Sequence, residues 1–175
     1  MLLGLSGSLR RASTNTKLLR VAARHYGGEF LEADLHLPLY DGDLEERSGI
    51  PAEVEALADQ IAEADAVVIA TPEYNQSLSG VLKNALDWVS RVKAKPWDDK
   101  PVALMSAAAG RAGGTRGNYA LRLAMTPFRP RLLTGEVLLA ASHTAFDESG
   151  ALVSEQYDDS VRVLMATLKS EVLRR

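Results

Sequence analysis

Cysteine is absent from the 175-residue chain. Its absence excludes disulfides, thiolate nucleophiles and zinc or iron–sulfur centres held by cysteine. The three histidines, His25, His36 and His143, are scattered along the sequence, which speaks against a metal site. A run of about 20 apolar residues, the length that a membrane span needs, is also lacking. We therefore expect neither a metal nor a membrane as a partner.

An excess of charge of one sign is lacking as well. Twenty lysines and arginines are interspersed with 23 aspartates and glutamates, for a formal net charge of −3. This balance offers no basic surface for nucleic acid. The start, 1–6, has no basic region of the kind that precedes a secretory signal, and we expect a cytoplasmic protein. The length favours one domain over residues 1–175.

Strand and helix signals alternate along the whole chain, which indicates βαβ units around a parallel sheet. A helix is expected to start at Pro51, in its first position, after a loop over 35–49. The other expected helices span about 14–26, 78–91, 118–125 and 157–173, and the expected strands span 1–5, 30–33, 66–70, 102–107 and 137–141. Five strands and five helices in this order predict an α/β fold, a flavodoxin-like three-layer sandwich with strand order 2-1-3-4-5.

The most informative segment is the loop 71–75, which has the sequence Thr-Pro-Glu-Tyr-Asn. It follows a continuous apolar run, 66–70, typical of a fully buried parallel strand. Pro72 ends that strand, because it has no amide proton and restricts the residue before it. The loop therefore lies at the carboxyl end of a buried strand, where open α/β sheets bind ligands.

The loop after the first strand is suited to an anion. Five hydroxyl side chains, one asparagine and two arginines lie within residues 6–16, at the start of a predicted helix. Exposed amides and the positive end of the helix dipole favour phosphate there, and Arg10 can bind it in bidentate fashion. A helix cap at Ser13 or Thr14 explains one of these residues but leaves the other hydroxyls and the arginines unexplained.

Other sequence patterns fit this loop less well. The P-loop pattern for ATP or GTP is absent, and so is the Gly-x-Gly-x-x-Gly pattern for dinucleotides. A serine-hydrolase elbow in this loop would lack its final glycine.

The loop that follows the fourth strand, 106–115, offers almost no side chains, and its small residues allow the close backbone approach that a planar ring requires. A phosphate beside loops of this kind points to a mononucleotide with a large ring, and FMN fits best.

Three motifs resemble one known family, the NAD(P)H-dependent FMN reductases of the flavodoxin-like group that includes chromate and quinone reductases. The first motif is Gly7-Ser8-Leu9-Arg10 with Ser13 and Asn15. The second runs from Thr71-Pro72-Glu73-Tyr74-Asn75 through Ser77 and Gly80 to Leu82–Trp88. The third is Gly110, Gly113-Gly114 and Arg116. They occur in the family's order and span most of the chain.

The resemblance implies a bound FMN, with hydride transfer from NADPH or NADH and onward transfer to a quinone or another small-molecule electron acceptor such as chromate, an azo compound or free flavin. It also implies a homodimer or homotetramer, with the helix 78–91 and its neighbours in the interface. It implies no obligatory catalytic residue in the protein. The residues that it assigns to FMN are Ser8, Arg10, Ser13, Asn15 and Thr16 at the phosphate, and Pro72, Glu73, Tyr74, Asn75, Ser106, Gly110 and Gly113 at the ring.

Several alternatives stay open at this point. Glu73 either orients the loop or a neighbouring subunit, or is a solvated carboxylate; Arg111 either meets the phosphate of NADPH or is solvated. Leu86 and Trp88 belong to the helix core or to an interface. Relatives usually carry hydroxyl residues where this chain has Ala107 and Ala108, so backbone amides would serve the flavin's pyrimidine edge. A flavodoxin-type electron carrier and a nucleotide-binding module without redox chemistry are the rival functions.

Overall fold

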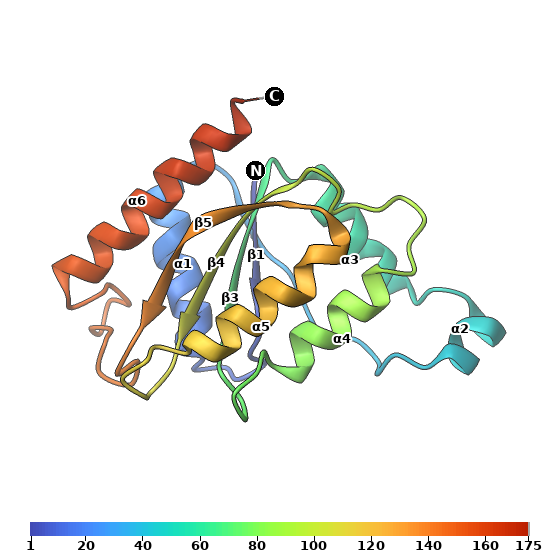
Figure 1. The fold of residues 1–175 in the computed structure, drawn as a ribbon, viewed down its shortest axis with the longest axis horizontal. Helices are drawn as coiled ribbons and strands as arrows, with labels where there is room; N and C mark the ends of the chain where they lie inside the picture. Colours follow the sequence, from blue (N-terminus) through green and yellow to red (C-terminus); the bar gives the residue numbers. More distant parts are fainter. Residues whose placement is uncertain (175) are drawn as a thin grey trace.

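A computed structural model describes residues 1–174 of the chain, and its centre is a five-stranded parallel sheet. The strand order is β2-β1-β3-β4-β5, which confirms the predicted flavodoxin-like topology (Figure 1). The central strand β3 is buried at every position, as its continuous apolar run predicts. The strands are β1 (Leu2–Ser6), β2 (Phe30–Glu32), β3 (Ala66–Thr71), β4 (Pro101–Ala107) and β5 (Arg131–Leu139).

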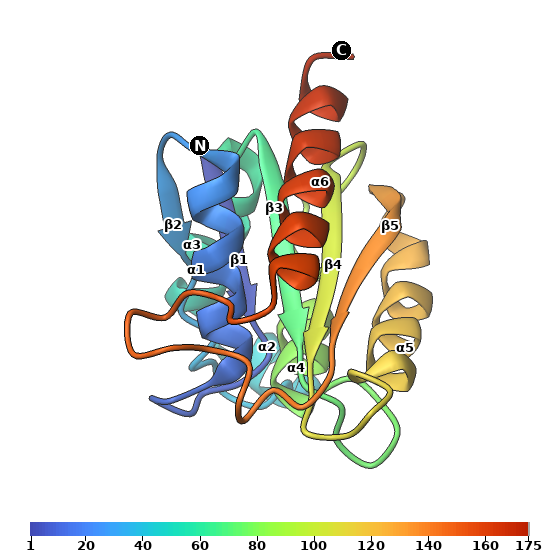
Figure 2. The ribbon, with the colours of Figure 1, turned by 90° about the vertical axis from the view of Figure 1, so that its left-hand side faces the viewer.

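Helices cover both faces of the sheet and make the three layers (Figures 1 and 2). On one face α1 and α6 pack against alternate strand residues such as Leu2, Val68 and Met105. On the other face α3, α4 and α5 pack against their neighbours, including Leu3 and Ile69. The helices are α1 (Thr14–Tyr26), α2 (Gly42–Ser48), α3 (Ala52–Glu63), α4 (Gly80–Val89), α5 (Thr115–Met125) and α6 (Glu155–Val172), with a 3₁₀ turn η1 (Thr126–Phe128).

The short helix α2 is the main departure from the predicted elements, because it lies in the segment 35–49 that was expected to be a loop. Asp41 caps its start by accepting a hydrogen bond from the Asp43 N–H (3.0 Å), and Gly49 ends it at a φ of 76°. None of its residues is buried. A helix without a buried face has no apolar period, so only its caps could have indicated it.

Several boundaries also differ from the expectation; α5, for example, begins at Thr115 and not at 118. Pro51 precedes α3 as its cap and is not its first residue. The strand β5 begins at Arg131, six residues before the expected Val137. The polar residues 134–136 interrupt the apolar run at an edge strand, where an irregularity in the pairing with β4 lies between Val102 and Leu104. Such an interruption hides an edge strand from an apolar pattern.

No helix in the described part of the chain combines the length and the hydropathy that crossing a membrane would need. The parallel arrangement instead brings the carboxyl ends of all five strands to one edge of the sheet. The loops that follow them lie together at this edge, at the bottom of Figures 1 and 2.

Candidate functional site

A cavity of about 500 Å³ lies at this carboxyl edge of the sheet. We call it the carboxyl-end cavity. Loops after β1, β3, β4 and β5 all contribute to it, which is the ligand position expected for an open α/β sheet. The lining residues are Ser8, Arg10, Ala12, Ser13, Thr14, Asn15, Lys17, Pro72, Glu73, Tyr74, Ala107, Ala108, Ala109, Ser142 and His143.

The first turn of α1 supplies free hydrogen-bond donors to the cavity. Ser13 caps the helix, and its Oγ accepts from the Thr16 N–H (3.2 Å). The amides of Thr14 and Asn15 donate to no acceptor within residues 1–174. Two unpaired amides at the positive end of a 13-residue helix form a site for an anion.

Two cations at the cavity lack carboxylate partners. Arg10 and Lys17 both line it, and neither forms an ion pair within the described residues. The Lys17 ammonium lies 5.7 Å from the centre of the Phe146 ring, a contact that leaves its charge uncompensated. The α1 side of the cavity therefore carries two positive charges without ion-pair partners in the described residues, which favours an anion such as phosphate.

Asn15 fastens the phosphate-side loop to the sheet. Its Nδ2 donates to the Ala107 carbonyl (3.0 Å), and its Oδ1 accepts from the Ala107 N–H (2.9 Å). The side chain is 3% exposed. One Nδ2 proton is left over after these two hydrogen bonds, so the donors that Asn15 can still offer a phosphate are that proton and its backbone amide. The sequence predicted that Asn15 lies at this cavity, but it did not predict the two hydrogen bonds to Ala107.

The other predicted phosphate residues divide into two groups. Ser8 and Ser13 line the cavity beside Arg10. Thr16 does not line the cavity; its Oγ1 donates to the Oγ of Ser6 (2.8 Å), the last residue of β1.

The loop after β3 ends in a two-residue hairpin at the mouth of the cavity. Tyr74 and Ser77 exchange two backbone hydrogen bonds of 3.1 Å, and Asn75 and Gln76 between them have φ values of 50° and 65°. Two consecutive left-handed residues match a type I′ turn. Tyr74 lines the cavity and is 49% exposed, whereas Asn75 at the tip of the hairpin does not line it.

Glu73 holds this loop against α5. Its Oε2 accepts from the amides of Arg116 (3.0 Å) and Gly117 (3.3 Å). A carboxylate at a helix N-terminus satisfies unpaired donors and interacts favourably with the helix dipole. Of the alternatives that the sequence left open, orienting the loop is the one that this geometry shows.

In the loop after β4, alanines and not glycines form the cavity wall. Ala107, Ala108 and Ala109 line it, whereas Gly110 and Gly113 do not. A β-carbon on Gly113 would lie 2.5 Å from the Leu138 carbonyl carbon, so Gly113 allows a close approach to protein backbone. Ser106 is fully buried, and its Oγ donates to the Thr71 carbonyl (2.7 Å).

Sequence reasoning missed the contribution of the loop after β5. Ser142 and His143 line the cavity, and the Thr14 Oγ1 donates to the Ser142 Oγ (3.4 Å). The signal was available: a loop that follows a fifth parallel strand reaches the same edge as the others. Lys17 lies one turn into α1, beyond the hydroxyl-rich loop, and the turn of the helix brings it to the cavity.

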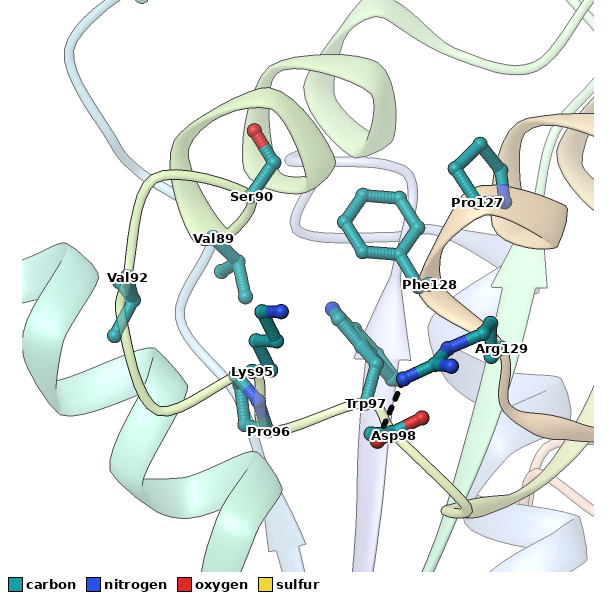
Figure 3. Close-up of a pocket in the computed structure, with 10 residues that line it drawn as sticks. All are labelled: Val89, Ser90, Val92, Lys95, Pro96, Trp97, Asp98, Pro127, Phe128 and Arg129. Carbon is teal, nitrogen blue, oxygen red and sulfur yellow. Dashed lines mark hydrogen bonds and ion pairs between the residues drawn. The ribbon is translucent and has the colours of Figure 1, made fainter.

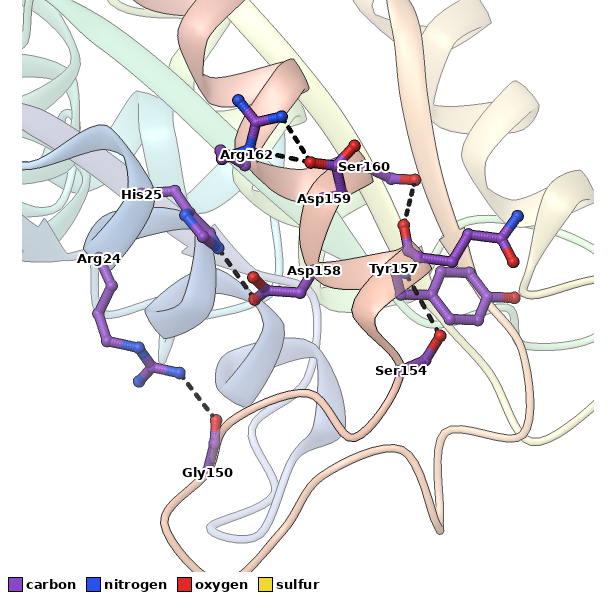
Figure 4. A network of polar contacts seen from close by, with 10 residues as sticks. Arg24, His25, Gly150, Ser154, Tyr157, Asp158, Asp159, Ser160 and Arg162 are labelled. Atoms are coloured by element: carbon purple, nitrogen blue, oxygen red, sulfur yellow. Dashed lines mark hydrogen bonds and ion pairs between the residues drawn. The ribbon is translucent and has the colours of Figure 1, made fainter.

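Polar contacts farther along hold this β5–α6 connection against α1 (Figure 4). Arg24 donates to the Gly150 carbonyl (3.0 Å), and the His25 Nε2 lies 2.9 Å from the Asp158 Oδ1. Both partners come from segments more than 120 residues away in sequence. The segment with Ser142 and His143 is therefore tied to the helix that supplies the free amides.

Comparison with known proteins agrees with the cavity's chemistry. The family described as NADPH-dependent FMN reductase matches residues 1–145. An NAD(P)H-dependent FMN reductase of Pseudomonas aeruginosa is 40% identical over 177 residues, which cover 98% of this chain and 95% of the relative. A quinone reductase of Escherichia coli is 46% identical over 122 residues, which cover 67% of this chain and 65% of the relative.

A solved structure shares the fold over almost the full length. The flavoenzyme NAD(P)H:(acceptor) oxidoreductase FerB of Paracoccus denitrificans superposes with a TM-score of 0.88 at 28% identity. The alignment covers 99% of this chain and 97% of that one. Family match, relatives and fold agree: the chain belongs to the NADPH-dependent FMN reductase family and is a flavin-dependent NAD(P)H oxidoreductase.

Proposed function

We propose that the carboxyl-end cavity binds FMN, with its phosphate at α1 and its ring between the β3 and β4 loops, and that the electrons pass to a quinone or a related small-molecule acceptor. The observation that carries the proposal is the pairing of two unpartnered cations with two unpaired helix amides at one side of the cavity. Names of relatives, which include quinone reductases, support the choice of acceptor.

The residues present fit such a group. Ser8, Ser13 and the amides of the first turn of α1 offer donors to a phosphate, and Arg10 and Lys17 offer charge. On the other side, the walls are Pro72, Tyr74 and small alanines, which suit a flat ring. Thr14, Ser142 and His143 extend the donor set on the phosphate side. For Thr16, Asn75, Ser106, Gly110 and Gly113 the predicted FMN contact stays a prediction.

The division of labour follows from this arrangement. When bound, FMN would supply the redox chemistry, the transfer of two electrons from NAD(P)H to the acceptor. The chain's residues bind and orient it: α1 fixes one end, the Tyr74 hairpin limits solvent access at the other, and Glu73 keeps that hairpin in place. We assign no residue of the chain a catalytic role.

The predicted assembly also stays a proposal. We propose a homodimer or homotetramer of one cytoplasmic, FMN-binding domain spanning residues 1–175, with α4 near the interface. Exposed apolar side chains on the neighbouring helix, Tyr119 (54%) and Leu123 (73%), support an interface on this face. Trp88 and Leu86 belong to the core of the subunit itself, at 0% and 3% exposure.

An absorbance spectrum tests the proposed cofactor. The purified protein, reconstituted with FMN and freed of excess, should show flavin bands that bleach on anaerobic addition of NADPH or NADH. Steady oxidation of the nicotinamide with a soluble quinone should follow. Bleaching without turnover would favour the electron-carrier alternative, and a protein that takes up no FMN would contradict the proposal.

Substituting Arg10 with glutamine should raise the Kd for FMN about ten- to a hundredfold, because a charge-assisted contact to phosphate is worth about 1.5–3 kcal/mol. Fluorescence quenching of FMN measures the change. Arg11→Gln is the matched control, since Arg11 is adjacent, exposed and outside the cavity lining. Equal losses in both variants would show a general charge effect and not a phosphate contact.

A further inference from the structure

A second cavity, of about 390 Å³, lies at the opposite edge of the sheet (Figure 3). We call it the amino-end cavity. It is formed where the chain leaves α4 and enters β4, and where η1 leads into β5. The seven residues of β4 separate it from the carboxyl-end cavity by roughly 20 Å. Its lining residues are Val89, Ser90, Val92, Lys95, Pro96, Trp97, Asp98, Pro127, Phe128 and Arg129.

Trp97 brings an unsatisfied polar group to this cavity. The residue is 2% exposed, and its Nε1 has no hydrogen-bond acceptor within the described residues. Figure 3 shows the indole nitrogen directed into the space between Val89, Lys95 and Phe128. Leaving a buried donor unpaired costs about 1–3 kcal/mol. Trp88 shows the ordinary situation, since its Nε1 donates to the Pro38 carbonyl (2.8 Å).

Lys95 adds an uncommitted charge to the same space. Its ammonium forms no ion pair within residues 1–174. Its backbone φ of 47° is left-handed, a conformation that a lysine adopts at a cost. The nearby charges at the rim are engaged with each other, because Arg129 donates to Asp98 (3.1 Å). Of the charged side chains in the lining, the one left without an ion-pair partner within residues 1–174 is therefore a cation.

The remaining wall is apolar and in part flat. Val89, Pro96, Pro127 and Phe128 surround the indole of Trp97. A cavity of a few hundred Å³ with apolar walls and a few convergent polar groups is typical of a small-molecule site. Its occupant must present acceptors, preferably anionic, to two donors and a ring to the aromatic wall.

From this geometry we propose that the amino-end cavity is a second ligand site, distinct from the FMN cavity, that takes a small aromatic carboxylate. The carboxylate accepts from the Trp97 indole N–H and from the Lys95 ammonium, and the ring packs on Phe128 and the prolines. The proposal does not depend on the carboxyl-end cavity or on its cofactor.

Nuclear magnetic resonance of the ¹⁵N-labelled, FMN-loaded protein tests the proposal with benzoate as the probe. The chain contains two tryptophans, so two indole N–H signals serve as reporter and internal control. We expect the Trp97 indole proton to shift downfield and saturate at millimolar benzoate, while the Trp88 signal stays in place. Lys95→Gln should weaken the binding several-fold, and the exposed Lys93→Gln should leave it unchanged.

Each contrary outcome is measurable in the same benzoate titration, followed by NMR and by flavin absorbance. A Trp97 signal that does not move, or moves without saturating, would overturn the proposal. So would an equal response to benzyl alcohol, which lacks the charge. A Trp97 signal that changes with protein concentration alone would show that a second copy of the chain covers the cavity. A change confined to the flavin bands would place benzoate in the FMN cavity.

Discussion

Replacing Asn15 with leucine should lower the free energy of unfolding by about 2–6 kcal/mol. The substitution keeps the number and branching of the side-chain heavy atoms but removes both hydrogen bonds to Ala107. The N–H and the C=O of Ala107 would then be left buried without partners, at about 1–3 kcal/mol each. Urea denaturation of the protein without cofactor measures this loss, because it excludes any stabilisation by FMN.

The same substitution should weaken FMN binding about tenfold or more. Asn15 ties the first turn of α1 to the end of β4, so the two sides of the cavity depend on one clamp. Thr16→Val is the control for stability, because it removes one partly buried hydroxyl contact to Ser6 from the same helix turn. If both variants lost the same stability, the two hydrogen bonds to Ala107 would have no special role, and an unchanged Kd for FMN in Asn15→Leu would show that the cavity does not depend on them.

The contrast between β3 and β5 shows how far the sequence alone could predict the fold. The run 66–70 is apolar at every position because β3 is buried on both faces, and such a run leaves little ambiguity. The strand β5 carries Thr134, Gly135 and Glu136, of which Glu136 is engaged by Asn118 and Arg122. The carboxylate of Glu136 is explained by these side-chain contacts with α5, which no local pattern reveals.

For the candidate site, too, the sequence predicted which loops come together but not the contacts between distant residues. Loops could be placed at one edge from strand order alone, and Ser8, Arg10, Ser13, Asn15, Pro72, Glu73 and Tyr74 all line the cavity. What each side chain does there depends on partners far away in sequence. Asn15 binds a residue 92 positions later, and the Glu73 carboxylate caps a helix that begins some 40 residues on. Spacing within a motif carries no information about such pairs.

The glycines of the loop after β4 can serve either the packing of the protein backbone or a contact with the cofactor. Substitutions at Gly113 and Gly110 distinguish these two roles. Gly113→Ala should destabilise the fold by about 3 kcal/mol or more. Its φ is 60°, and the added β-carbon would lie 2.5 Å from the Leu138 carbonyl carbon, in backbone that cannot move aside. Gly110→Ala should stay within about 0.5 kcal/mol, because a β-carbon there meets nothing within 4 Å.

Thermal and urea unfolding of the two variants, each compared with the unsubstituted protein, decide between packing and cofactor contact. If Gly113 serves the close approach of β5 and not of a flavin, its variant loses stability with and without FMN. If Gly110 touches the ring, as the family resemblance implies, Gly110→Ala raises the Kd for FMN while its stability without cofactor is unchanged. A Gly113→Ala protein as stable as the original would contradict the packing seen here, since no flexible side chain is available to relieve that contact.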